Sequence, residues 1–133
     1  MEIGLPLAGI IFISESAFSY KSRREIGNRD KWECQYDGCD DGEGRPKSFK
    51  NGWMVFASHI GTHDKKDPDY DNPDNGRIQC IEHEIAFHNE LLQDAIQSED
   101  KRQIRFNEMA LEKLSHVDHR TYAYRKEEKG MMV

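Results

Sequence analysis

Runs of apolar residues along the chain predict its main elements. The run at 53–57 is rich in aromatic and β-branched residues and is typical of a strand, and 77–80 predicts a shorter strand. Residues 81–96 follow directly, and their apolar positions recur with the helical period, so we expect a helix there. A continuous apolar run at 9–13 predicts a further strand near the N-terminus.

A second helix is expected over 98–115. Ser98 suits the N-cap position, and Glu99 and Asp100 would then lie in the first turn, where negative charge complements the helix dipole. The apolar stripe of this segment is narrow and consists of Ile104, Leu111 and Leu114. We therefore expect a peripheral helix.

These elements suggest three parts. Residues 1–29 would form an N-terminal strand and a basic arm. The basic segment 21–33, which begins in this part and runs into the next, predicts either a short helix or an extended arm. Residues 30–96 would form the core, and 97–133 a C-terminal helix with a loose tail. The mixture of strands and helices predicts an α+β fold.

The composition limits the core that this fold can build. Of the 133 residues, 26 are Leu, Ile, Val or Phe, about a fifth of the chain, and 33% are charged. So few large apolar residues indicate either disorder or a core held by a covalent or metal cross-link. The two Trp, five Tyr and six Phe argue against disorder, which favours a cross-link.

The first residues predict neither a secretory leader nor a membrane anchor. Glu2 lies where a leader would carry positive charge, and the apolar run 3–13 contains Pro6 and is too short to cross a bilayer. We therefore expect a cytoplasmic protein without a membrane partner. In a reducing compartment, clustered cysteine and histidine indicate metal ligands before they indicate disulfides.

Two short-spaced pairs of soft ligands stand about 40 residues apart. Cys34 and Cys39 form a Cys-x4-Cys pair around a turn, and Cys80 and His83 form a Cys-x2-His pair where the helix begins. Two such pairs can complete a tetrahedral Zn²⁺ site, which would close the long loop between them and supply the missing cross-link. The alternative is three buried or free thiols with a surface histidine.

Between and beyond these pairs lies a second ordered set of residues. His59 ends the first predicted strand, Asn75 precedes the second, and Glu84 and His88 follow on the helix. This order resembles the HNH (ββα-metal, His-Me finger) endonuclease family. The run 34–39, Cys-Gln-Tyr-Asp-Gly-Cys, is also similar to a zinc knuckle found there, and the resemblance covers roughly residues 30 to 92.

The resemblance implies a zinc-stapled ββα core and metal-dependent hydrolysis of phosphodiester bonds in DNA. His59 would be the general base that takes a proton from water, and Asn75 would fix the loop that orients it. Glu84 and His88 would bind Mg²⁺ or another divalent cation next to the scissile phosphate. The zinc ion would be structural.

This sequence departs from the family pattern at two positions near the expected cation. Ser58 stands before the base histidine, where the family usually has a metal ligand, and Glu84 replaces the usual histidine. His63 and Asp64 follow the strand closely and are candidates for the lost ligand.

Helical geometry separates the two expected metal sites. Glu84 and His88 are four residues apart and share one face of the helix. His83 lies about 140° from His88 at 100° per residue, which suits it to a different ion.

Each residue of the second set also has a simpler interpretation. His59 fits a half-buried strand histidine, and Asn75 with Gly76 fits an ordinary turn. Glu84 and His88 fit a solvated pair on a helix.

The charge distribution bears on DNA binding. The net charge of −6 opposes binding to phosphates, but the acidity is concentrated in 34–99, whereas residues 100–133 sum to +2. Bound cations would offset part of this acidity. The alternative function is a non-catalytic HNH-like zinc module that binds DNA or a protein partner, for instance in a phage or mobile-element assembly.

Overall fold

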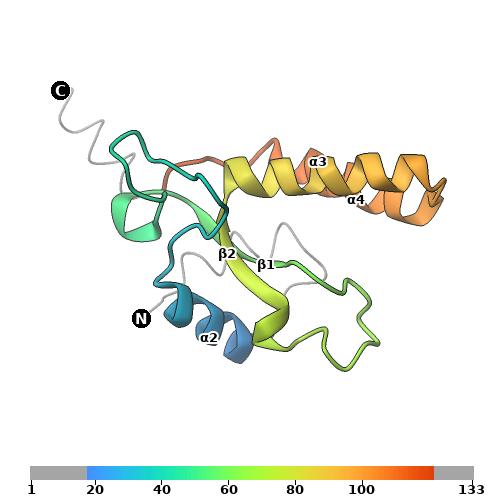
Figure 1. The fold of residues 1–133 in the computed structure, drawn as a ribbon, viewed down its shortest axis with the longest axis horizontal. Coiled ribbons are helices and arrows are strands. Elements are labelled where there is room, and N and C mark those ends of the chain that lie inside the picture. The colour runs from blue at the N-terminus through green and yellow to red at the C-terminus, as the bar shows by residue number, and fades with distance from the viewer. Residues whose placement is uncertain (1–17, 122–133) are drawn as a thin grey trace.

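The computed structural model describes residues 18–121, and these form two strands and three α-helices. The strands β1 (Val55–His59) and β2 (Gly76–Cys80) pair in an antiparallel two-stranded sheet. Helix α2 (Tyr20–Asp30) lies on one side of this sheet (Figure 1). Two long helices, α3 (Ile81–Gln97) and α4 (Lys101–Leu114), lie together on the other side.

The sheet and the first long helix agree closely with the sequence. The α+β class, both strands of the core and a helix directly after the second strand are confirmed. β1 is displaced by two residues from the expected 53–57, because Trp53 pairs instead with Arg120 in an isolated bridge. Strand pairing within the sheet therefore begins only at Val55, which lies opposite Cys80.

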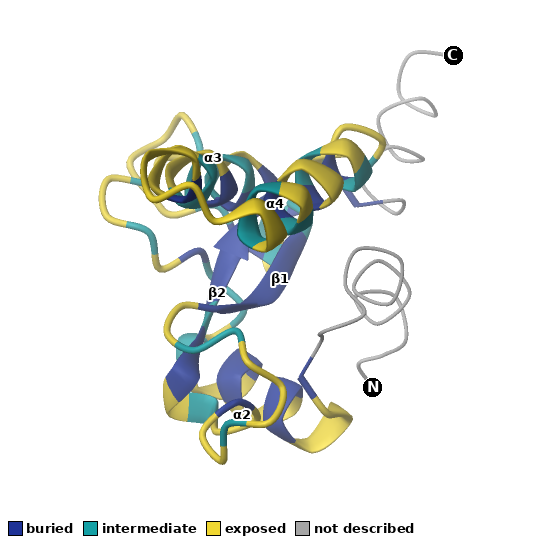
Figure 2. Cartoon of the chain, turned by 90° about the vertical axis from the view of Figure 1, so that its right-hand side faces the viewer, coloured by how far each residue is buried: buried dark blue, intermediate teal, exposed yellow. Residues whose placement is uncertain are grey.

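Helix α2 resolves the choice between a helix and an extended arm for the basic N-terminal segment. Ser19 caps it by accepting the backbone N–H of Ser22, and Ile26 is fully buried against the sheet. Asp71 holds the same end, since its side chain accepts hydrogen bonds from both serine hydroxyls. Both faces of the sheet are consequently covered, and every residue of β1 is buried (Figure 2).

The second long helix differs from its prediction at its start. Ser98 terminates α3, Glu99 adopts a left-handed φ of 55°, and Asp100 caps α4 by accepting the backbone N–H of Gln103. Helix α4 packs on α3, and only its residues Asn107, Ala110 and Leu114 are buried. Leu114, the last residue of the helix, joins Phe56 and Ile81 in a core cluster.

Two parts of the prediction lie outside the described residues, namely the strand at 9–13 and the tail from 122 onward. The division at residues 29/30 and 96/97 stays a prediction, with α2 running across the first boundary and α4 packing on α3 across the second. Within residues 18–121, no helix has the length and apolar character needed to cross a membrane.

Candidate metal centre and candidate active site

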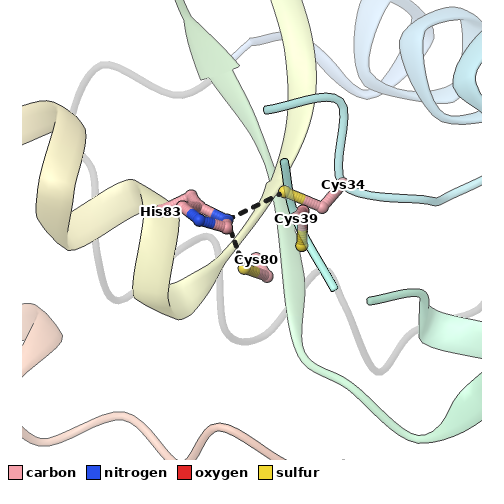
Figure 3. Close-up of side chains that lie close together, drawn as sticks. All are labelled: Cys34, Cys39, Cys80 and His83. Atoms are coloured by element: carbon pink, nitrogen blue, oxygen red, sulfur yellow. Dashed lines mark hydrogen bonds between the residues drawn. The ribbon is translucent and has the colours of Figure 1, made fainter. Parts of the chain in front are cut away.

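Two segments that are far apart in the sequence bring the predicted zinc ligands together. Cys34 lies just after α2, where its N–H donates to the carbonyl of Lys47. Cys39 follows a turn closed by its N–H and the carbonyl of Tyr36. Cys80 is the last residue of β2 and His83 lies in the first turn of α3. We call Cys34, Cys39, Cys80 and His83 the thiol cluster (Figure 3).

The geometry of the thiol cluster fits a tetrahedral ion. The four ligand atoms lie within 4.8 Å of one another. His83 Nδ1 is 3.5 Å from Cys34 Sγ and 3.3 Å from Cys80 Sγ. A tetrahedral Zn²⁺ with usual bond lengths separates nitrogen and sulfur ligands by about 3.6 Å. The cluster could therefore hold a metal ion and is compatible with structural zinc.

The protonation of the thiols also suits an ion. A hydrogen bond from Cys80 lowers the pKa of Cys34 to about 5, and the same bond raises the pKa of Cys80. Burial raises the pKa of Cys39. One thiolate is thus already favoured, and the cysteines form no disulfide. Tyr36 stacks on the His83 ring at 4.3 Å between centroids and fixes its plane.

Further along α3, Glu84 lies at the centre of a second buried group. It is 6% exposed, and one of its carboxylate oxygens, Oε1, accepts hydrogen bonds from the Ser58 hydroxyl and, at 2.8 Å, from Gln79 Nε2. Its other oxygen lies 3.4 Å from His88 Nε2. We call this group, with Asn107 on α4, the carboxylate cluster: Ser58, Gln79, Glu84, His88 and Asn107.

Glu84 and His88 form a buried carboxylate–imidazole pair. Burial opposes charge on both groups, but the hydrogen bond and the charge of His88 outweigh it and lower the pKa of Glu84. At His88, burial lowers the pKa, but the hydrogen bond and the charge of Glu84 outweigh this effect, so the pKa of His88 is raised. A cation bound here would therefore replace the His88 proton.

The opposite nitrogen of His88 reveals a residue that the sequence analysis missed. His88 Nδ1 lies 2.8 Å from Asn107 Oδ1, and Asn107 is 1% exposed. Its position was visible in the sequence, because Asn107 falls at helical spacing within the apolar stripe formed by Ile104, Leu111 and Leu114. A polar residue in such a stripe indicates a buried hydrogen bond.

His59, the expected general base, lies at the end of β1 with its ring stacked on two aromatic side chains. The centroid distances are 3.7 Å to Phe18 and 4.2 Å to Tyr70. Burial lowers the pKa of His59 to about 4, so the imidazole is neutral at neutral pH. Its Nε2 atom is buried and has no hydrogen-bond partner among the described residues.

Asn75 ties together the loop that joins the two strands. Its Oδ1 accepts the N–H of Gly61 at 2.9 Å, and its Nδ2 donates to the carbonyls of Thr62 and Tyr70 at 2.9 and 3.2 Å. The loop that Asn75 ties together contacts the His59 ring through Tyr70, which stacks on it. These contacts go beyond those of a simple turn.

A hollow of about 1040 Å³ lies between β1, the following loop and the two long helices. His59, Glu84 and His88 all border it, so the structure places three of the four residues of the second set around one space. His63 also borders it, with its ring centroid 6.1 Å from that of His59. Five basic side chains line the rim: Lys65, Lys66, Arg102, Arg105 and Lys113.

The two candidate cation sites differ in the number of protein ligands. Among residues 18–121, the thiol cluster is the one group of at least three His, Cys, Asp or Glu side chains close enough to share an ion. Neither His63 nor Asp64 completes such a group with Glu84 and His88, although both border the hollow. The separation of 3.4 Å between Glu84 Oε2 and His88 Nε2 fits two ligands of one ion at about 2.1 Å each.

No protein-family model, no curated protein and no solved structure matches this chain.

Proposed function

We propose that the protein is a metal-dependent DNA endonuclease of the HNH type. The observation that carries the proposal is the shared hollow, which is bordered by a neutral histidine, His59, and by a carboxylate–imidazole pair, Glu84 and His88. The thiol cluster at the start of α3, holding zinc, would fix this helix against the sheet.

The proposed reaction is hydrolysis of one phosphodiester bond. His59 takes a proton from a water molecule, whose oxygen bonds to phosphorus while the bond to the 3′ oxygen breaks. Glu84 and His88 would hold Mg²⁺ or another divalent cation, which polarises the phosphate and stabilises the charge on the leaving 3′ oxygen when bound. That oxygen takes its proton from solvent, which leaves a 3′ hydroxyl and a 5′ phosphate.

The rim of the hollow supports an anionic substrate. Its five basic side chains exceed its three acidic ones, Asp64, Glu84 and Asp100, although the chain as a whole carries −6. Positive charge lining a concave surface attracts phosphates and raises their rate of arrival. The three reduced cysteines fit the proposed cytoplasmic location.

Plasmid nicking tests this proposal. With Mg²⁺ or Mn²⁺ present, we expect wild-type protein to relax supercoiled DNA and His59→Ala to do so about 10²- to 10⁴-fold more slowly, the usual contribution of a general base. His116→Ala is the matched control, since His116 is exposed and pairs with Glu112 outside the hollow. Nicking by His59→Ala at the wild-type rate would refute the assignment of the base.

A second function is favoured by the contacts of the carboxylate cluster. Both oxygens of Glu84 already have protein partners, and the Ser58 hydroxyl occupies the place of the family's additional ligand. A non-catalytic zinc module that binds DNA or a protein partner needs no cation here. Salt-sensitive DNA binding without nicking by the wild type would select this function.

A further inference from the structure

Asn107 has a fixed orientation inside the protein. Its Nδ2 donates to the carbonyl of Gln103 at 2.8 Å, one turn earlier in α4. Its Oδ1 is therefore the atom that faces His88 Nδ1 at 2.8 Å, and an amide oxygen only accepts hydrogen bonds. It follows that His88 Nδ1 carries a proton in both the neutral and the charged imidazole.

This contact determines which nitrogen of His88 can bind a cation. With Nδ1 protonated, the neutral ring presents the lone pair of Nε2, the atom that lies 3.4 Å from Glu84 Oε2. His83 presents the opposite atom, since its Nδ1 faces Cys34 and Cys80. Two histidines five residues apart in α3 thus present different nitrogens to their candidate ions.

We infer that Asn107 is a positioning residue for a divalent cation held by Glu84 and His88. This inference rests on the proposed function, because it assigns Asn107 a role at the same site. A hydrogen-bond acceptor on the remote nitrogen of a ligating histidine fixes the ring and strengthens it as a ligand. Helix α4, which lies beyond the stretch that resembles HNH nucleases, thereby becomes part of the cation site.

The surroundings of Asn107 single it out for this role. Phe87 and Phe106 lie against the His88 ring, with centroids 5.8 and 6.1 Å away, and bury it without offering an acceptor. Burying a side-chain amide costs free energy unless all its polar atoms form hydrogen bonds. An apolar residue at position 107 would complete the apolar stripe of α4 without this cost. The Asn107 amide forms both bonds: its oxygen accepts from His88, and its nitrogen donates to the backbone carbonyl of Gln103.

Manganese titration of the zinc-loaded full chain tests the inference. Mn²⁺ bound to the protein is distinguished from free Mn²⁺ by electron paramagnetic resonance, so no activity is needed. We expect Asn107→Leu to weaken Mn²⁺ binding by about 10- to 100-fold, the usual effect of removing such a partner. Asn107→Asp keeps the acceptor and should bind at least as tightly as wild type. Asn89→Leu, an exposed position on α3, is the matched control and should leave the affinity unchanged.

Nitrogen NMR of the histidine rings provides a second readout that does not depend on added Mn²⁺. In alkaline buffer, where the imidazole is neutral, wild-type His88 should show Nδ1–H, and Asn107→Leu should show a mixture of both tautomers. His83 should keep Nε2–H in both proteins.

The outcomes separate this inference from the proposed function. Wild-type affinity for Mn²⁺ in Asn107→Leu, or Nε2–H on His88 in the wild type, would overturn the role of Asn107 alone. A wild-type protein that binds no Mn²⁺ near Glu84 would overturn both.

Discussion

Helix α3 carries two polar clusters that differ in how completely the protein itself satisfies them. In the thiol cluster, four ligand atoms converge within 4.8 Å, and the contacts among them are weak hydrogen bonds of sulfur. In the carboxylate cluster, Glu84 and His88 already have strong partners in Ser58, Gln79 and Asn107. A metal ion in the thiol cluster would add strong contacts that the protein itself does not supply there, whereas Glu84 and His88 already have strong contacts with protein groups.

Under the proposed function, this difference would give two ions on one helix separate tasks. Zinc in the thiol cluster would close the long loop between Cys39 and Cys80 and so contribute to folding. A cation at Glu84 and His88 would bind and leave without changing the fold, as an exchangeable reaction site requires.

Removal of zinc should give the largest effect. A chelator strong enough to strip the thiol cluster, or Cys80→Ser, should abolish cooperative thermal unfolding, because the loss is on the order of the whole stability of a small domain, about 5–15 kcal/mol. Calorimetry with and without added Zn²⁺ measures this. An unchanged melting temperature after chelation would contradict the claim that an ion in the thiol cluster contributes to folding.

Breaking the buried ion pair should have the next largest effect. His88→Ala leaves the Glu84 carboxylate buried without the positively charged imidazole that pairs with it. This change should lower the free energy of unfolding by about 3–5 kcal/mol. The double variant Glu84→Gln/His88→Ala carries no such charge and should recover more than half of that loss. Denaturant unfolding of the three proteins checks this, and a cost below about 1 kcal/mol for His88→Ala would show that the pair is not buried as described.

Removal of basic side chains from the rim should have the smallest effect, confined to substrate binding. Each of Arg102→Ala and Arg105→Ala should reduce the slope of log affinity against log salt for duplex DNA by about 1, with no change in melting temperature. Lys101→Ala is the control, since Lys101 begins α4 but does not line the hollow. Equal slopes for Arg102→Ala and Lys101→Ala would place bound DNA elsewhere.

The sequence predicts features that depend on local spacing. The Cys-x4-Cys and Cys-x2-His pairs identified the thiol cluster, and hydrophobic periodicity located both strands of the sheet and α3. The start of α4 was missed by local reasoning, because Ser98 and Asp100 are both good capping residues and the left-handed turn at Glu99 selects the second.

The remaining features depend on contacts between distant segments. Phe18 and Tyr70 stack on His59 from 41 and 11 residues away, and nothing near His59 in the sequence indicates either partner. Asn107 was detectable as a polar residue in an apolar stripe, but its partner, His88, follows only from the packing of α4 on α3.

Anomalous diffraction from crystals grown with Zn²⁺ and Mn²⁺ tests the two-site description most directly. We predict a zinc peak among the three sulfurs and His83 Nδ1, and a separate manganese peak bonded to Glu84 Oε2 and His88 Nε2. A zinc peak with no manganese within about 3 Å of that pair would contradict the claim that α3 holds two ions with different tasks.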